Sequence, residues 1–257
     1  MRLNDWIADM ERIAPPELAL AWDNVGLLVS PETERIERVL VALDCTAEVA
    51  DEAADCGAQL VLTHHPVLFS GAKRILRDAP DTAAVYRLIR RGVGLYAAHT
   101  NLDAAPGGVN DALAARLGLT DVRPLPPEGL GRVGTLPEAL PLAAFAALAE
   151  RALGCTALVS GGADAMVRTV ALVGGAGGSD IAAAAQAGAD AFVTGECRHH
   201  QALEARVRGV ALLACGHYAT ERVVLEALIA RLQAVENDVQ YQVAQAESDP
   251  LRRMQEG

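Results

Sequence analysis

Apolar runs of strand length alternate with alanine-rich helical stretches along the first part of the chain. The run at 39–43 (VLVAL) predicts a buried strand, and 47–55 predicts a helix. A second strand is expected at 60–63, a helix at 82–91 and a third strand at 93–98. Parallel strands that are buried on both faces have continuous apolar runs of this kind. The alternation therefore predicts an α/β fold with a largely parallel sheet.

The second half of the chain repeats this order of elements. Residues 170–194 align with residues 39–63 without a gap, 131 positions further along. After a shorter connection, 209–217 (GVALLACGH) matches 92–99 (GVGLYAAH). We therefore expect two related three-layer α/β lobes with mixed, largely parallel sheets. The first lobe is expected at 1–125 and the second at 126–257, with a proline-rich junction at 124–127 and a C-terminal helix that can pack back on the first lobe.

Composition narrows the class of protein. Of the 257 residues, 51% are apolar and 21% are charged, which is typical of a compact globular chain and not of a disordered one. The formal net charge of -11 argues against binding to long nucleic acids and to anionic membranes, but it permits a mononucleotide ligand.

The cysteines and the N-terminus indicate a cellular compartment. The five cysteines are odd in number and form no CxxC pair, so a disulfide framework and a thiolate zinc site are not expected. The start, MRLNDWIADMERI, alternates charged with apolar residues and predicts an amphipathic helix, not a signal peptide. No run approaches the roughly 20 apolar residues of a membrane span. The expectation is a soluble, cytoplasmic protein.

All six histidines lie at the ends of predicted strands or just beyond them. They are His64, His65, His99, His199, His200 and His217. In parallel α/β sheets, ligands bind at the carboxyl ends of the strands. A single histidine is more often a hydrogen-bonded core or surface residue than a ligand. Six histidines so placed, with none elsewhere, favour a metal site.

Two of these histidines are followed by a carboxylate four residues later. The pairs are His99 with Asp103 in HTNLD and His217 with Glu221 in HYATE. A nitrogen donor beside an anionic oxygen suits Zn, Fe, Mn, Co or Ni, and a carboxylate can also bridge two cations. The alternative is that Asp103 caps the following turn and that Glu221 lies in a first helical turn, where the helix dipole stabilises it. Spacing alone does not separate these two interpretations.

Several motifs together resemble one known family. They are WDNVG (22–26), THHP followed by VLF (63–69), HTNLDAAPGGVND (99–111), TGE followed by HH (194–200) and GHYATE (216–221). In this order they resemble the Nif-three-like family, whose members are often labelled GTP cyclohydrolase 1 type 2 homologues. The resemblance runs from about Trp22 to Glu221, most of the chain. Cys197 and Arg198 depart from it, because an apolar residue and a lysine are commoner there.

The resemblance implies a fold, a metal centre and an assembly. The two lobes would face each other across a cleft that holds two divalent metal ions, and the chains would form a ring-shaped homohexamer. The family's ligands fall on His64, His65, Asp103, His217 and Glu221. The short interval between Asp103 and His217 leaves little room for the extra domain that some relatives carry.

Three histidines remain outside that ligand set. His99 is a candidate hydrogen-bond partner of the ligands or a proton donor, because metal ligands need outer hydrogen bonds to fix them. His199 and His200 are candidates to line the cleft. For each of the three, a turn histidine satisfied by the backbone is an equally good interpretation.

Two glycine-rich turns, at 106–109 (PGGV) and at 174–181, are candidate phosphate sites. The segment GGAGGSDI (174–181) leaves a strand and opens a helix, so the amides of Gly177 and Gly178 could cradle a phosphate. It matches neither GxGxxG nor GxxxxGK. A tight turn capped by Ser179 or Asp180 explains it better.

The ligand set supports three functional hypotheses. The first is metal-assisted hydrolysis, which the family label specifies as ring opening of GTP or a related nucleotide with release of formate. The second is a non-catalytic metal-binding or interaction protein, such as a metal carrier or assembly factor. The third is phosphoester hydrolysis on damaged nucleotides. A pocket and an exchangeable metal position would separate an enzyme from a binding protein.

Overall fold

The computed structural model describes residues 1–127, 129–235 and 238–251. The chain forms two compact units, Met1–Leu102 with Leu228–Gly257 and Asp103–Ala227, each around its own β-sheet. The segment 103–125 groups with the second sheet, although the proline-rich junction predicts a division after residue 125. The reason is burial, because Leu113 and Ala114 pack into the core of the second unit.

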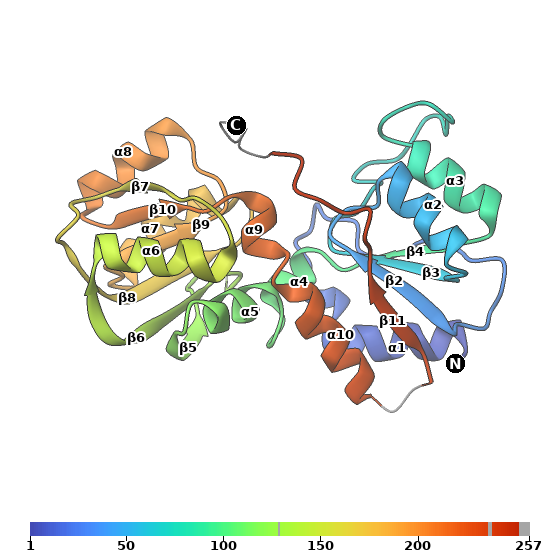
Figure 1. Cartoon of the computed structure of the whole chain (residues 1–257), viewed down its shortest axis with the longest axis horizontal. Coiled ribbons are helices and arrows are strands. Elements are labelled where there is room, and N and C mark those ends of the chain that lie inside the picture. Colours follow the sequence, from blue (N-terminus) through green and yellow to red (C-terminus); the bar gives the residue numbers. More distant parts are fainter. Residues whose placement is uncertain (128, 236–237, 252–257) are drawn as a thin grey trace. The chain divides into compact units, whose positions relative to one another are not determined.

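The first unit is a five-stranded sheet between helices (Figure 1). Its order is β1 (Gly26–Val29), β4 (Gly94–Ala97), β3 (Leu60–Thr63), β2 (Arg38–Ala42) and β11 (Gln240–Val243). The four strands from β4 to β11 are parallel, and β1 is antiparallel to β4. One face packs against α2 (Ala47–Asp55) and α3 (Ala83–Arg91). On the other face, α1 (Leu3–Ile13) places Trp6 edge-on against Tyr96 of β4, with ring centroids 5.4 Å apart.

The second unit is a six-stranded mixed sheet. Its order is β5 (Thr120–Pro124), β6 (Arg132–Pro141), β8 (Met166–Val173), β9 (Ala191–Thr194), β10 (Ala211–Ala214) and β7 (Leu158–Ser160). The centre, β8–β9–β10, is parallel, and antiparallel strands flank it on both sides.

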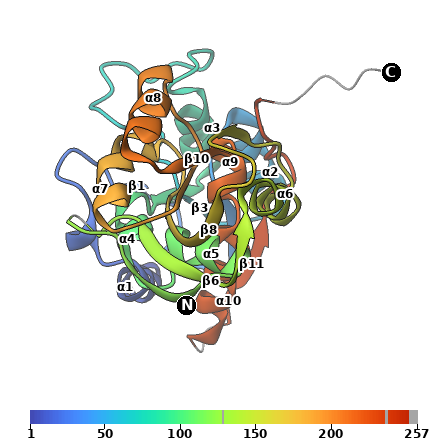
Figure 2. The same ribbon diagram turned by 90° about the vertical axis from the view of Figure 1, so that its left-hand side faces the viewer.

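Successive residues of these strands face opposite layers, as the pleat requires. Val170 and Leu172 pack toward α5 (Val109–Arg116) and α6 (Leu142–Leu153). Ala171 and Val173 pack toward α7 (Ile181–Gln186) and α8 (His199–Arg208). Figure 2 shows α7 and α8 together on one side of this sheet and α6 on the other. The unit therefore has three layers.

The internal repeat is visible in the strand register. In the first unit Val39 pairs with Leu60 and Ala42 with Thr63. The pairs 131 positions later, Val170 with Ala191 and Val173 with Thr194, have the same parallel register. In each unit the third strand, β4 or β10, then pairs in parallel with the second strand, β3 or β9. The two units are thus built on one strand–helix–strand plan.

Local sequence explains where these elements begin and end. The hydroxyl of Thr46 accepts a hydrogen bond from the amide of Val49 at 3.2 Å and so caps α2. Gly92 ends α3 with a φ of 66°, a left-handed conformation that glycine adopts without strain. The remaining helical elements are η1 (Pro16–Leu18), α4 (Thr100–Ala104), η2 (Gly177–Asp180), α9 (His217–Glu221) and α10 (Val224–Ala234). Among the described residues, none of the helices has the length and apolar character needed to cross a membrane.

Candidate metal centre

Three histidines cluster at the carboxyl ends of β3 and β4 in the first unit. The backbone amides of His64 and His65 continue the strand pairing by donating to Ala42 and Leu43. The ring centroid of His64 lies 4.9 Å from that of His65 and 5.1 Å from that of His99. Ring nitrogens of the three residues lie within 4.8 Å of one another, close enough to share a metal ion. Sequence reasoning thus found the cluster, because parallel strands bring their carboxyl ends together.

Each ring of this cluster is oriented by a hydrogen bond at Nδ1. The Nδ1–H of His64 donates to the carbonyl oxygen of Ala98 at 2.9 Å. Those of His65 and His99 donate to the carboxylates of Asp44 and Asp23, each also at 2.9 Å. A proton held on Nδ1 leaves the lone pair on Nε2, the atom that then binds a metal. Such outer acceptors are the usual companions of metal-binding histidines.

Asp23 anchors His99 and was not singled out as a site residue by the sequence. Its side chain is fully buried. One oxygen accepts from His99, and the other accepts from the backbone amide of Thr100 at 3.0 Å and from its hydroxyl at 2.5 Å. Burial alone raises the pKa of Asp23, but the hydrogen bonds from Thr100 and His99 outweigh it, and the pKa lies below its ordinary value. The only sequence signal was its place in WDNVG.

His99 is held in its neutral form. Burial lowers its pKa below the ordinary 6.5, and the neighbouring His64 lowers the pKa further, while the Asp23 carboxylate opposes the shift. A neutral imidazole can accept a proton or bind a cation at neutral pH. Position and protonation state both suit a role beside a metal.

The second unit presents an imidazole and a carboxylate on one helical turn. α9 begins at His217 and ends at Glu221, so the two side chains, four residues apart, lie on one face. The Nδ1–H of His217 donates to Glu196 at 2.8 Å, and its Nε2 lies 3.0 Å from the carboxylate of Glu221. Glu221 is buried at the end of its helix, so it is not in a first turn stabilised by the helix dipole.

The distance between His217 Nε2 and the Glu221 carboxylate fits either a hydrogen bond or a shared cation. With Nδ1 donating to Glu196, Nε2 is an acceptor in the neutral ring and a second donor in the protonated ring. Two acceptors repel each other at this distance unless a proton or a cation lies between them. Ligands that share an ion at about 2.1 Å lie about 3.0–3.4 Å apart, so the observed geometry fits a metal ion.

Three glycines pack against this pair, and sequence reasoning did not single out any of them as site residues. A Cβ on Gly175 would overlap the carboxylate of Glu221 and approach His217 Nε2 to 3.0 Å. A Cβ on Gly195 would lie 2.8 Å from the Cα of His217, and one on Gly174 would lie 3.4 Å from the side chain of Glu221. Only glycine allows the loops after β8 and β9 to approach the ligands this closely.

Asp103 also belongs to the second unit. It is a buried residue inside α4. The side-chain N–H of Asn110 donates to the backbone carbonyl of Asp103 at 3.3 Å. The side-chain oxygen of Asn110 accepts from the backbone amide of Gly174 at 2.9 Å. Asn110 thereby links the HTNLD segment to the glycine loop beside Glu221. The unit thus supplies two buried carboxylates and one imidazole.

The other sequence candidates lie elsewhere. His199 and His200 are exposed in the first turn of α8, and neither belongs to any group of described side chains that could share a metal. Gly177 and Gly178 are buried in η2. A Cβ at Gly177 would overlap Val173, and one at Gly178 would lie 2.5 Å from Gln201. Close packing explains these two glycines. Asp180 precedes α7 without a capping hydrogen bond from its side chain.

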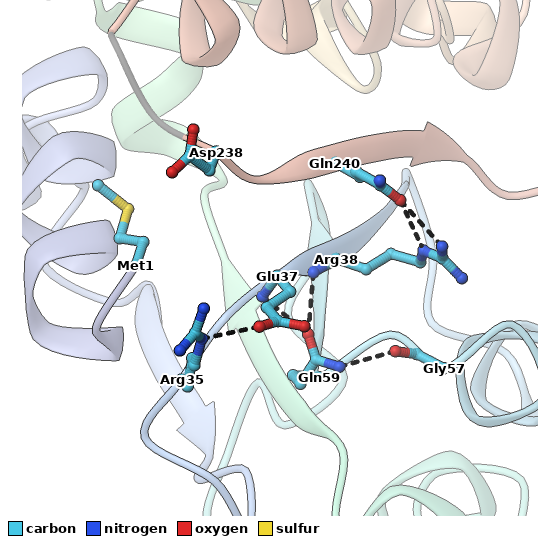
Figure 3. A pocket seen from close by; sticks show the side chains of 8 residues that line it. All are labelled: Met1, Arg35, Glu37, Arg38, Gly57, Gln59, Asp238 and Gln240. Atoms are coloured by element: carbon cyan, nitrogen blue, oxygen red, sulfur yellow. Dashed lines mark hydrogen bonds and ion pairs between the residues drawn. The ribbon is translucent and has the colours of Figure 1, made fainter.

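A separate hollow of about 420 Å³ lies at the opposite, amino ends of the first unit's strands (Figure 3). Its two arginines are already engaged, as Figure 3 shows. Arg38 donates to Gln240 at 2.9 Å, and Arg35 pairs with Glu37 at 2.7 Å. Ligands of parallel sheets bind at the carboxyl ends, where the histidines lie. The amino-end hollow is therefore not the candidate site.

The donor set fits divalent transition metals. The first unit offers imidazole nitrogens, and the second offers two buried carboxylates and an imidazole. Such mixed nitrogen and oxygen donors suit Zn, Fe, Mn, Co and Ni. The fold and these side chains define a class: a two-unit α/β protein with potential metal-binding groups after its central strands.

The comparisons with known proteins agree with this class. The chain belongs to the Duf34/NIF3 (NGG1p interacting factor 3) family, whose model matches residues 1–250. It is 38% identical to the "GTP cyclohydrolase 1 type 2 homolog" of Streptomyces coelicolor, over 97% of this chain and 93% of the relative. It is 31% identical to the "Protein NIF3 homolog" of Schizosaccharomyces pombe, over 95% of each chain. The crystal structure of a Bacillus cereus protein related to NIF3 matches 99% of both chains, with a TM-score of 0.92 and 25% identity.

Proposed function

We propose that this protein is a metal-dependent hydrolase with two divalent ions held by His64, His65, Asp103, His217 and Glu221. The observation that carries the proposal is the set of hydrogen bonds at Nδ1 of the three histidines. These bonds fix the rings and direct Nε2 toward a cation. The two carboxylates add negative charge and can bridge two ions.

Two bound divalent ions would lower the pKa of a water molecule toward 7 and polarise the bond under attack. The chain's own residues position that chemistry. The acceptors Ala98, Asp44 and Glu196 hold the ligand rings, and the glycine loops hold His217 and Glu221 in place. We propose His99 for proton transfer, because its ring lies beside the His64 and His65 rings and Asp23 fixes its orientation.

The proposed reaction is hydrolytic opening of the purine ring of GTP or a related nucleotide. Its support is the name borne by several relatives, "GTP cyclohydrolase 1 type 2 homolog". Water adds to C8, both bonds from C8 to nitrogen break, and two water molecules are consumed. C8 leaves as formate, and the nitrogens keep the protons as amines. No oxidant or reductant is required.

Formate release tests this proposal. The protein is stripped of metal, reconstituted separately with Mn, Fe, Zn or Co, and incubated with GTP. We expect formate and a diaminopyrimidine product in at least one reconstitution, and neither in the stripped protein. If no reconstitution releases formate while the protein still binds metal, the proposed reaction is wrong. A metal carrier or interaction protein is then the better description. The homohexamer that the resemblance implies and the cytoplasmic location expected from the sequence remain predictions.

A further inference from the structure

Two large aromatic side chains face solvent beside the histidine cluster. Trp22, in the loop before β1, is 60% exposed, and Phe69, in the segment after β3, is 50% exposed. Their rings are nearly parallel, with an interplanar angle of 18° and centroids 6.4 Å apart. By contrast, Trp6, Phe145 and Phe192 are fully buried. Exposed aromatic faces are costly to hydrate, so this pair requires an explanation.

Two polar anchors fix the segments that carry these rings. Asp23, adjacent to Trp22, is held by His99 and Thr100. The next residue, Asn24, donates its side-chain amide to the carbonyl of Leu68, adjacent to Phe69. The loop before β1 is therefore tied both to the histidine cluster and to the segment after β3. The aromatic pair is preorganised, which lowers the entropic cost of binding a ligand.

The pair borders the proposed metal centre. His99 meets Trp22 and Phe69 edge-on, with centroid distances of 6.0 Å and 5.5 Å. Shielding His99 from water explains these edge contacts. It does not explain why half or more of each aromatic side chain remains exposed. The exposed surface of these two rings is where a second planar ring can stack.

A hollow of about 810 Å³ continues from Phe69 along the same segment. The charged residues that line it are Lys73, Arg74 and Asp81, an excess of one positive charge. Lys73 is the only lysine of a chain whose formal net charge is -11. A positive lining beside an aromatic pair suits a ligand with a planar base and an anionic tail.

We propose that Trp22 and Phe69 form a stacking platform for the base of a nucleotide, and that Lys73 and Arg74 contact its phosphates. This assignment rests on the proposed function, since it names the residues that recognise the substrate of that site. Base stacking on an aromatic residue tolerates different bases, so the platform selects nucleotides as a class.

Equilibrium binding to the metal-loaded protein tests the platform. The probes are GTP, guanosine and inorganic tripolyphosphate. Trp22→Ala and Phe69→Ala should each raise the Kd for GTP about tenfold, the effect typical of one lost stacking partner. Trp22→Phe should restore most of the affinity. Tripolyphosphate should bind these variants as it binds the wild type, whereas Lys73→Gln should weaken its binding.

Ile89→Ala is the matched control, because Ile89 is 54% exposed on α3 of the same unit and lies outside the histidine cluster. It should leave all three affinities unchanged. Tryptophan fluorescence adds a direct signal: Trp6 is buried and Trp22 is exposed, so GTP should quench the wild type and not Trp22→Phe. If Trp22→Ala does not fold, Trp22→Leu keeps an apolar side chain without a ring and should show the same loss.

The outcomes separate this inference from the proposed function. If Trp22→Leu and Phe69→Ala bind GTP as tightly as Ile89→Ala does, the platform is overturned, even if formate is released. If the wild type binds GTP through Trp22 but no formate appears, the platform stands and the hydrolase proposal fails. If none of GTP, ATP, CTP and UTP binds the metal-loaded wild type, the platform is overturned.

Discussion

The Nδ1 of His99 donates to a carboxylate oxygen of Asp23 at 2.9 Å, and the side chain of Asp23 is fully buried. The two residues are 76 positions apart in the chain. A carboxylate so buried is stable only because His99 and Thr100 satisfy both of its oxygens. The bond therefore both orients His99 and stabilises the loop that carries Trp22.

If the proposed hydrolysis occurs, replacing Asp23 by Asn should slow it by roughly 10- to 100-fold, the usual effect of losing an outer partner of metal ligands. The amide keeps the size of the side chain but presents an N–H to either His99 or Thr100, each of which donates to Asp23 in the wild type. The free energy of unfolding, measured in urea, should fall by about 1–3 kcal/mol. Asp78→Asn is the control, because Asp78 pairs with Arg77 on the surface. Equal activity in both variants would contradict the positioning role.

His65→Ala and Glu221→Ala should each lower the metal content without unfolding the protein. Each change removes a proposed ligand from a site where the remaining donors cannot complete the coordination. Elemental analysis after dialysis measures bound metal, and circular dichroism checks the fold. His200→Ala is the matched control, because this histidine is exposed on α8. Full metal occupancy in both ligand variants would refute the assignment.

Gly175→Ala should weaken metal binding and destabilise the second unit more than Gly188→Ala. Both glycines have a positive φ, 59° and 74°, so both substitutions carry a backbone penalty of about 1–2 kcal/mol. At Gly188 a Cβ meets nothing within 4 Å, whereas at Gly175 it overlaps Glu221. The free energy of unfolding should therefore be lower for Gly175→Ala than for Gly188→Ala by about 1–3 kcal/mol. A lower urea midpoint would show this difference. Identical midpoints and metal affinities would show that the close approach is not needed.

The metal-free protein should lose stability as the pH falls below 6.5. The pKa of His99 is lowered in the folded state, so the unfolded state takes up a proton first, and stability is lost as the pH falls from 6.5 through the folded value. Asp23 acts in the same direction at more acidic pH, because its pKa is also lowered. Urea midpoints at pH 7.5 and 5.5 measure the effect. His99→Asn, which can still donate to Asp23, should be less sensitive to this change.

The strands and helices around the site could be predicted because their signals are local. The helix expected at 47–55 is α2, and the strand expected at 60–63 is β3. The register repeat at 131 residues could also be predicted, because both units use the same apolar runs. β11 could not be predicted, since its strand partner, β2, lies about 200 residues earlier in the chain.

The candidate ligands could be named from strand ends and motifs, but their supporting residues could not. Nothing in the sequence distinguishes the supporting carboxylates from other acidic residues. Only the fold brings each of them against an imidazole: Asp44, Glu196 and Asp23. In the same way, Gly175 looks like one more glycine of a flexible turn. Its role depends on the approach of Glu221, which is 46 positions later in the sequence.

The sequence by itself determined the α/β class, the repeated plan and the histidines at strand ends. These features depend on the spacing of apolar residues and on where each strand ends, and both are local properties of the sequence. Only the tertiary structure decided which oxygen orients each imidazole and which glycines admit the ligands. It also decided that Trp22 and Phe69 are exposed together beside His99. Those relationships depend on distances between remote segments, and such distances are set by packing, not by local sequence pattern.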